Sequence, residues 1–426
     1  MRLLLFTQHF PPETVATGRR ASDLAESLTS RGHHVTVIAG WPNHPSSLGL
    51  PFCQRVAQDE YTAEGYRIRR VRLFRSADPG ILNRFLTYAT FMLSAAWWGI
   101  WQPRPDAILA VSPLPTGLAA LPAHWWHRAP LVFDLQDIWP DSALAIGVME
   151  RGWGLRMLRR LERFFYWRCA GVVGITNGFK RYLVDLGLPP ERVAVIHNGV
   201  DWENFAGAPP RDDLRRVEQL AGKFVVGYIG NLGLAQRLDT VLEAAEELRN
   251  EPVAFLLLGE GVEKQRLMAL ARARSLQNVR FLEGVPRKDV PSVLATCDAL
   301  LAMLRDDPLF GITIPSKIYE YMAAGKPILC SVGGEAAALV VEARCGLPVC
   351  PSDASALADS VRTLLADPSR CRALGEAGAA WARARFARSG LMDAYADLVE
   401  RLSGGKAQLP QPAEPPPLEH VDLTEP

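Results

Sequence analysis

A glycine-rich segment at residues 227–233 has residues that could bind a phosphate. It reads Gly-Tyr-Ile-Gly-Asn-Leu-Gly, follows a predicted strand and precedes a predicted helix that starts near Leu238. Glycines let the backbone approach a ligand closely, and the N-terminus of a helix offers unpaired N–H groups and a partial positive charge. A tight turn that binds nothing would have the same residues. The spacing is not Gly-x-Gly-x-x-Gly, which argues against a nicotinamide cofactor.

A second segment, residues 315–327, places a cation and a carboxylate on one helical face. Lys317, Glu320 and Ala324 follow one another at i, i+3 and i+7, so they share that face. The ammonium of Lys317 suits the oxygens of a diphosphate, and the carboxylate of Glu320 suits the two vicinal hydroxyls of a ribose. A solvated Lys–Glu pair without a ligand is the alternative interpretation.

Short apolar runs alternate with helix-like stretches in two successive parts of the chain. In the first part the predicted strands are 3–6, 35–39, 68–73, 107–111, 131–135, 172–175 and 193–196, with a helix at 18–30. In the second part they are 225–229, 254–258, 279–282, 299–304 and 327–330, with helices at 240–249 and 263–274. Such runs are typical of strands buried on both faces, and the alternation predicts parallel sheets wrapped by helices.

The chain of 426 residues is too long to fold around a single hydrophobic core. We therefore predict an α/β fold with two Rossmann-like, doubly wound domains that face each other across a cleft. The first covers residues 1–206 and the second 223–388, joined by a linker at 207–222, and a tail at 403–426 is too rich in Pro and Glu to fold. Ligands bind such folds at the carboxyl ends of the strands, which places the site between the domains.

Composition narrows the class of protein. The formal net charge is +1, so no global field favours nucleic acid as a partner. The seven cysteines form no Cys-x-x-Cys pair, which favours free thiols in a reducing compartment over disulfides or zinc. The N-terminal sequence MRLLLFTQHF lacks a small-residue cleavage site and is predicted to be a strand rather than a signal peptide. These observations predict a cytoplasmic protein.

Residues 85–103 carry no charge and several aromatic side chains, which approaches the length of a membrane span. Polar residues within the stretch favour a buried or interfacial helix instead. Arginines precede it, and a second basic and aromatic stretch covers residues 156–168. Arginine beside tryptophan and phenylalanine suits an anionic lipid surface, although ordinary amphipathic helices produce the same pattern. The preceding arginines are Arg67, Arg69, Arg70, Arg72, Arg75 and Arg84.

Taken together, the motifs resemble those of family-four retaining glycosyltransferases. Within that family the chain is similar to the colanic-acid and O-antigen transferases, in the group of the L-fucosamine transferases. The order and spacing of the motifs carry the resemblance over nearly the whole chain, up to about residue 402. The segments concerned are 10–13 with Gly18, 32–37, 137–141, 196–201 with Phe205, 230–236 and 315–327.

The resemblance implies the GT-B fold, a nucleotide-sugar donor bound mainly by the second domain, and no metal or other cofactor. It also implies that a last helix, roughly 389–402, packs back on the first domain. Glu320 matches the second glutamate of the family's Glu-x7-Glu motif, which holds the donor ribose. For retention it implies front-face attack, in which the departing phosphate takes the acceptor proton, so that the protein's tasks are positioning and charge stabilisation.

Three positions depart from the family pattern. Ile312 stands at the first glutamate, and Asn231 and Gln236 stand where the family has the arginine and lysine of the phosphate loop. A diphosphate leaving group needs its developing charge stabilised. Our hypothesis is that Lys317, aided by the amides of the glycine-rich segment and by Arg237, replaces the missing cations.

The remaining site assignments follow from the same motifs. Asp137 comes after a predicted strand, where it would act in catalysis by orienting the acceptor hydroxyl or the donor sugar, or would only cap the following helix. Glu13 and Gly18 lie in the first strand-to-helix loop and are predicted acceptor-side contacts. His9 and His197 are interpreted as core or loop histidines. The predicted donor-binding residues are Gly230, Asn231, Gly233, Gln236, Gly259, Glu260, Ser316 and Glu320.

The sequence thus predicts transfer of a hexose or N-acetylhexosamine from a nucleoside diphosphate sugar to a saccharide or polyprenyl-diphosphate-linked acceptor, in the synthesis of O-antigen, capsule or exopolysaccharide. The predicted location is the inner face of the cytoplasmic membrane, as a peripheral protein. Two alternatives stay open: a nucleotide-sugar 2-epimerase of the same fold, and a non-catalytic membrane-associated scaffold. The sequence identifies neither the sugar, the nucleotide base, the acceptor nor the linkage.

Overall fold

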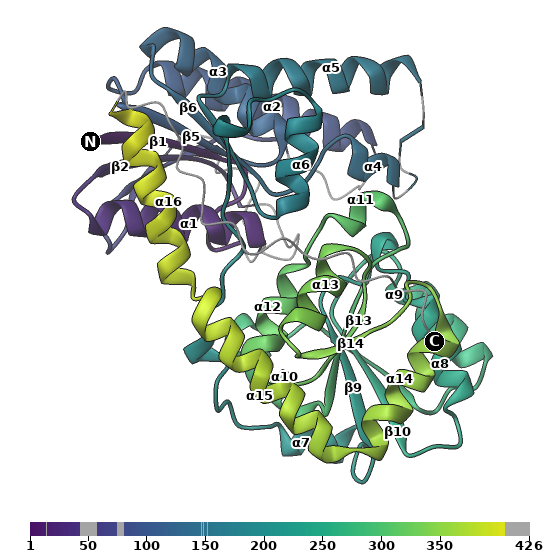
Figure 1. Ribbon diagram of the computed structural model, residues 1–426. Coiled ribbons are helices and arrows are strands. Elements are labelled where there is room, and N and C mark those ends of the chain that lie inside the picture. Colours follow the sequence, from purple (N-terminus) through teal and green to yellow (C-terminus); the bar gives the residue numbers. More distant parts are fainter. Residues whose placement is uncertain are drawn as a thin grey trace.

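The chain folds into two β-sheets, each flanked by helices (Figure 1). The computed structural model describes residues 1–13, 15–42, 58–74, 81–145, 147, 149–150 and 152–404. Several residues named above therefore lie outside the described part of the chain. They are Arg75, the side chain of Arg84 and residues 405–426 of the predicted tail.

The first sheet has eight strands in the order β3-β4-β2-β1-β5-β6-β7-β8. Every neighbouring pair is parallel except β3 with β4. The strands are β1 (Arg2–Thr7), β2 (His34–Gly40), β3 (Gln58–Tyr61), β4 (Arg67–Val71), β5 (Ala107–Val111), β6 (Leu131–Leu135), β7 (Gly171–Gly174) and β8 (Val193–Val195).

The second sheet has six parallel strands in the order β11-β10-β9-β12-β13-β14. The strands are β9 (Phe224–Ile229), β10 (Val253–Leu258), β11 (Val279–Leu282), β12 (Ala299–Met303), β13 (Ile328–Ser331) and β14 (Gly346–Pro348).

Helices connect the strands in both parts. Those of the first part are α1 (Ala16–Ser30), α2 (Ile81–Ile100), α3 (Leu114–His127), α4 (Asp141–Ala145), α5 (Trp153–Arg168) and α6 (Asn177–Asp185). Those of the second part are α7 (Asp212–Val217), α8 (Asp239–Glu247), α9 (Lys264–Ala273), α10 (Val290–Thr296), α11 (Pro308–Gly311), α12 (Ser316–Ala323), α13 (Glu335–Glu342), α14 (Ala354–Ala366) and α15 (Pro368–Arg385). The last helix is α16 (Arg388–Ser403).

Successive residues of the central strands face opposite sides of each sheet, and both sides are buried. In β1, Leu3 and Leu5 pack into one core, whereas Leu4 and Phe6 pack into another on the opposite face. The strands of the second sheet divide between two cores in the same way. A strand buried on both faces needs an apolar residue at every position, which explains the unbroken apolar runs of the sequence. The chain therefore has two Rossmann-like α/β domains, as predicted.

All predicted strands are present, with ends shifted by at most two residues. The strands β3 and β14 were not predicted. β3 is an antiparallel edge strand whose first three residues are Gln58, Asp59 and Glu60, so it has no apolar run. β14 has only three residues and includes Pro348. Helix α7 lies inside the segment predicted as a linker.

The uncharged stretch predicted as a buried or interfacial helix forms most of α2. Phe91 and Ala95 are buried against the first sheet, whereas Trp97 is 59% exposed. Among the described residues, no helix combines the length and the apolarity that a membrane span requires.

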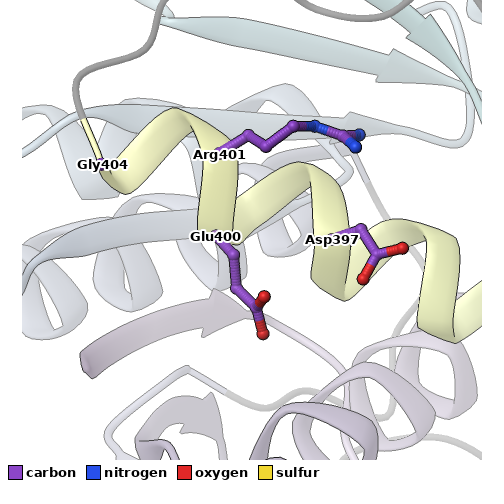
Figure 2. A pocket seen from close by; sticks show the side chains of 4 residues that line it. All are labelled: Asp397, Glu400, Arg401 and Gly404. Carbon is purple, nitrogen blue, oxygen red and sulfur yellow. The ribbon is translucent and has the colours of Figure 1, made fainter.

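The last helix, α16, leaves the second domain and packs against α1 of the first (Figure 1). Arg31 pairs with Asp397 at 2.5 Å and with Asp393 at 3.3 Å, and His33 Nε2 lies 2.8 Å from Glu400 Oε1. A hollow of about 410 Å³ lies at this end of the helix, lined by none of the residues predicted to bind the donor. Figure 2 shows the residues that line it. Its lining residues are Asp397, Glu400, Arg401 and Gly404.

A buried ion pair ties α1 to the first sheet. Arg20 Nε donates to Asp134 Oδ2 at 2.8 Å, and both side chains are at most 4% exposed. Its other two guanidinium nitrogens also donate: Nη1 to the carbonyl oxygen of His197 and Nη2 to that of Ile196, both at 2.9 Å. The guanidinium also lies 5.6 Å from the ring centroid of Tyr395 on α16. The buried charge therefore meets partners from three other segments, which are β6, the loop after β8 and α16.

We expect Arg20→Ala to lower the free energy of unfolding by about 3–5 kcal/mol, because the substitution leaves the Asp134 carboxylate buried without its cation. Urea-induced unfolding monitored by tryptophan fluorescence measures the change. Arg249→Ala is the matched control, because its partner Glu246 is 44% exposed, and it should change stability by less than about 0.5 kcal/mol. Equal losses in the two variants would contradict the role given to Arg20.

Candidate functional site

Helix α12 presents the predicted donor residues beside the end of strand β9. Ile318 and Met322 are fully buried and anchor the helix in the core of the second domain. The Tyr321 hydroxyl donates to the carbonyl of Ile229 at 3.3 Å and lies 3.2 Å from its amide, which fixes the helix against the last residue of β9. Because these residues face inward, the partly exposed side of α12 carries Lys317 and Glu320.

The ammonium group of Lys317 is buried and makes no hydrogen bond in the described structure. Nζ lies 3.6 Å from the centroid of the Tyr228 ring, and a Cβ added to Gly230 would come within 2.9 Å of it. Removal from water lowers the pKa of Lys317 to about 7, and the negative charge of Glu320 opposes that shift. A cation held in this way is suited to an anionic ligand that approaches the backbone of Gly230.

Glu320 is held by Arg287, a residue that the sequence analysis did not select. Arg287 Nη2 donates to Glu320 Oε1, and the two side chains are 41% and 18% exposed. Arg287 begins the short helix η5 (Arg287–Asp289), which follows the edge strand β11. Its position in the sequence could have identified Arg287, because a cation just beyond the carboxyl end of a predicted strand lies where such folds bind ligands.

The glycine-rich loop is closed by its own hydrogen bonds. The amide of Gly230 donates to the last carbonyl of β10 at 2.9 Å, and that of Leu232 donates to the Glu260 carbonyl at 2.8 Å. The amide of Gly233 donates to Gln236 Oε1 at 3.1 Å. These three amides are already satisfied, so the predicted help of Gly230 and Gly233 in phosphate binding is not available in this conformation. The ammonium of Lys317, which makes no hydrogen bond, remains available to the charge of a diphosphate.

Gly259 allows the loop after β10 to touch the glycine-rich loop. Its φ is +145°, and a Cβ there would lie 1.9 Å from the carbonyl oxygen of Gly230. The neighbouring Glu260 has an exposed side chain that pairs with Lys264 at 2.7 Å, and this hydrogen bond lowers the pKa of Glu260. Gly259 thus contributes through backbone packing.

Three other predicted residues, Asn231, Ser316 and Arg237, are exposed. Arg237 has a left-handed backbone with a φ of 50°. Within the described part of the chain, no hydrogen bond or ion pair joins any of the three to Lys317 or Glu320. Among the described residues the structure therefore brings Lys317, Gly230 and Glu320 together and shows no hydrogen bond or ion pair from Arg237 to them.

Ile312, at the position of the family's first glutamate, packs across the contact between the two domains. A Cβ added to Gly178 of α6 would lie 2.4 Å from Ile312 Cβ, and Thr176 Oγ1 donates to the Ile312 carbonyl at 2.7 Å. Beside this contact, Arg181 of α6 pairs with Glu335 of α13 at 2.6 Å. The position thus contributes an apolar contact between domains, with no carboxylate.

Asp137 lies after β6 and is exposed. Its Oδ2 accepts a hydrogen bond at 3.0 Å from the hydroxyl of Ser142, which lies in the first turn of α4. A helix cap would require the carboxylate to accept from a backbone amide of α4, whereas this contact is with a side-chain hydroxyl. The assignment of Asp137 to catalysis stays a prediction.

Glu13, predicted on the acceptor side, is buried, and its place beside the acceptor stays a prediction. Both carboxylate oxygens lie 3.2 Å from His9 Nδ1, and Oε2 also accepts from the Phe10 amide at 3.1 Å. A Cβ on Gly18 would come 3.0 Å from the His9 carbonyl, so glycine here serves the packing of α1 against the loop. Glu13 and Gly18 together position His9, whose side chain is 20% exposed at the carboxyl end of β1.

The first of the two basic stretches predicted to face lipid is engaged inside the protein. Arg70 is 2% exposed and donates to the Gly40 carbonyl, and Arg69 pairs with Asp59 at 2.6 Å. The guanidinium of Arg69 also lies 4.3 Å from the ring centroid of Trp98. The prediction of a lipid-facing surface is therefore wrong for these two arginines, because internal partners hold them.

The second basic stretch, on α5, is exposed, and we group it with the exposed tryptophans of α2 and α3 under the name aromatic face. The buried residues of α2, α3 and α5 share one core over the first sheet, so the three helices cover the same side of it (Figure 1). Their outward surfaces expose tryptophans and, on α5, arginines. The aromatic face consists of Trp97, Trp101, Trp125, Trp126, Trp153 and Trp167, with Arg156, Arg160, Arg163 and Arg168.

Among the described residues, no group of three or more His, Cys, Asp or Glu side chains is placed to hold a metal ion. The charges at the candidate site are the ammonium of Lys317, the guanidinium of Arg287 and the carboxylate of Glu320. A cation beside a loop backbone and a carboxylate one helical turn away can bind an anion and a diol together.

Two family models match the chain in succession. The Glycosyl transferase 4-like domain matches residues 16–199, and Glycosyl transferases group 1 matches residues 210–381. Among the relatives of the chain, the protein named as colanic acid biosynthesis glycosyl transferase WcaI of Escherichia coli is 26% identical over 389 residues, which cover 86% of this chain and 93% of the relative. Glycosyltransferase WbjE of Pseudomonas aeruginosa is 29% identical over 231 residues, 53% of this chain and 57% of the relative.

Solved structures share the fold over almost the full length. HepE of Anabaena, in complex with UDP and glucose, superposes with a TM-score of 0.70 at 19% identity and covers 94% of this chain and 99% of its own. Sucrose-phosphate synthase of Thermosynechococcus elongatus superposes with a TM-score of 0.76 at 18% identity, covering 95% and 99%. With two matched glycosyl transferase domains in this arrangement, the chain belongs to the family-four glycosyltransferases of the GT-B fold.

Proposed function

We propose that this glycosyltransferase moves a sugar, with retention, from a nucleoside diphosphate sugar to a saccharide or lipid-linked acceptor in the synthesis of a surface polysaccharide. The observation that carries the proposal is the Lys317 ammonium, buried without a hydrogen bond beside Gly230 and one turn from Glu320. A buried cation without a partner is costly unless a ligand supplies the opposite charge. The name of WcaI, which refers to colanic acid biosynthesis, and the complex of HepE with UDP and glucose support this choice of substrates.

In the proposed reaction Lys317 stabilises the negative charge that develops on the departing diphosphate. Fixed positive groups aimed at developing charge are among the strongest contributions to catalysis. Glu320 receives the ribose hydroxyls. The departing phosphate takes the proton of the acceptor hydroxyl, so the protein positions the two substrates and needs no metal ion of its own.

We also assign the aromatic face to the inner surface of the cytoplasmic membrane, where a polyprenyl-diphosphate-linked acceptor would lie. Trp126 is 68% and Trp153 74% exposed, and tryptophan favours the boundary between lipid and water. The arginines of α5 supply the charge that attracts anionic lipid headgroups. The face lies on the first domain, the predicted acceptor side.

A donor screen tests the proposed function. We expect one of the UDP-, GDP- or dTDP-sugars to raise the melting temperature of the protein and to be consumed only when an acceptor is added. Conversion of the donor without an acceptor would favour the epimerase, and the absence of binding to any of these nucleotides would favour the scaffold.

We expect Lys317→Met to lower kcat by roughly 10²-fold with the protein still folded, because it removes the cation that faces the leaving group. Lys317→Arg should retain more activity, since the charge remains. Initial rates with the donor found in the screen measure both, and Lys288→Met, an exposed lysine on η5, serves as the control. Wild-type rates in Lys317→Met would remove Lys317 from the mechanism.

The affinity for the donor should fall as the pH rises through about 7, the pKa of Lys317 in the free protein. An anionic donor favours the protonated lysine, so binding is strongest where the ammonium is charged before the donor arrives and weakens where it has lost its proton. Lys317→Arg should bind the donor with a flat profile over this range, because arginine stays charged. Calorimetric titrations with the nucleotide sugar at several pH values measure both profiles. If the affinity of Lys317→Arg fell with pH as steeply as that of the wild type, Lys317 would not be the titrating group.

The aromatic face predicts binding to anionic vesicles. The protein should float with phosphatidylglycerol-containing vesicles at low salt and be released at high salt, because the charges of α5 are screened. Replacing both Trp125 and Trp126 by serine should leave it in the soluble fraction. Val341→Ser, which removes an exposed apolar residue from α13 of the second domain, should float like the wild type. Failure of the wild type to float at low salt would defeat the membrane assignment.

A further inference from the structure

Lys317 and Glu320 have the spacing of an ion pair but do not form one. Lysine and glutamate three residues apart on a helix are neighbours that readily pair. In the described structure the Glu320 carboxylate instead receives Arg287, and Lys317 Nζ rests on the ring of Tyr228 without a hydrogen bond. The two groups predicted to bind opposite ends of the donor are thereby kept apart.

The residue that separates them comes from another element. Arg287 stands at the start of η5, beyond β11, whereas Glu320 lies on α12. Its guanidinium carbon lies 5.8 Å from the ring centroid of Phe205, so an apolar face lies beside the charge. Arg287 binds Oε1 of the carboxylate, and Oε2 makes no hydrogen bond among the described residues. One oxygen of Glu320 therefore stays open to a ligand.

Without Arg287, the cation nearest to Glu320 along its helix would be Lys317. A carboxylate attracts an ammonium more strongly than an aromatic ring does, because the ring offers only a quadrupole. A Lys317–Glu320 pair would neutralise the ammonium and occupy the carboxylate. A diphosphate would then have to displace Glu320 before it could bind.

We propose that Arg287 is a positioning residue that engages Glu320 and thereby leaves Lys317 unpaired for the diphosphate of the donor. The inference rests on the proposed function, since it concerns the same site. It explains how a loop with Asn231 and Gln236 in place of the family's cations keeps one free positive charge.

Other roles for Arg287 predict different results. If Arg287 touched the diphosphate itself, its loss would weaken binding whether or not Glu320 were charged. If it were only a surface ion pair, worth about 0.2–1 kcal/mol, its loss would leave ligand binding unchanged. Only the positioning role predicts that neutralising Glu320 repairs the loss of Arg287.

A double-mutant cycle on the full-length chain separates these roles. Binding of inorganic pyrophosphate, UDP and GDP is measured by calorimetry for the wild type, Arg287→Ala, Glu320→Gln and the double variant. We expect Arg287→Ala to weaken pyrophosphate binding about tenfold, a coupling of the size seen between contacting charges. Glu320→Gln should bind pyrophosphate like the wild type, and the double variant should recover to within about twofold of it.

The pH dependence of the pyrophosphate affinity provides a second test, because a merely structural role of Arg287 would leave it unchanged. In Arg287→Ala the freed carboxylate of Glu320 favours the charged form of Lys317. The pH at which the pyrophosphate affinity begins to fall, the midpoint of the profile, should therefore shift to a higher value. The double variant should return to the wild-type midpoint. Lys288→Ala removes the same charge from the next residue of η5 and should match the wild type in affinity and midpoint. Thermal unfolding of each variant checks that it is folded.

Three results would overturn the inference: equal weakening in Arg287→Ala and the double variant, no weakening in Arg287→Ala, or equal weakening in Lys288→Ala. Each leaves the proposed function intact as long as the wild type binds a nucleoside diphosphate. A wild type that binds none of the three ligands would overturn the proposed function, and this inference with it.

Discussion

A positive charge that is removed from water and given no hydrogen-bond partner is unfavourable, and the second domain holds Lys317 in this condition. Buried residues of α12 fix the helix, Tyr228 covers the ammonium, and the glycine at 230 leaves room for it. Arg287 meanwhile occupies the neighbouring carboxylate. A free cation beside a loop backbone thus results from several contacts, none of which would produce it alone.

The arrangement of the two domains depends on a different kind of contact. Ile312 packs on Gly178 where the family's glutamate would stand, and the pair Arg181–Glu335 lies beside it. On the other side, α16 returns to α1. Apolar packing and a charged pair thus form one contact between the two domains, and the returning helix forms another.

Basic residues near aromatic ones have opposite uses in this protein. Arg69 lies over Trp98 and pairs with Asp59, and Arg70 is buried, so both serve the packing of β4. On α5, by contrast, the arginines and tryptophans face outward. The local sequences are alike, and the difference arises because a strand in a covered sheet has no outward face, whereas a helix on the surface of the domain always has one.

The sequence by itself determined the two α/β domains, because strands buried on both faces need continuous apolar runs, and it placed Lys317 and Glu320 on one face, because helical spacing is local. It did not reveal β3, whose residues are polar, or Arg287, which lies far from Glu320 along the chain. It also did not reveal that the carboxylate of Glu13 is buried against His9. Only the tertiary structure decided these points, because the partners and the burial of a side chain depend on which distant segments come together. The spacing of residues within one segment does not specify those long-range contacts.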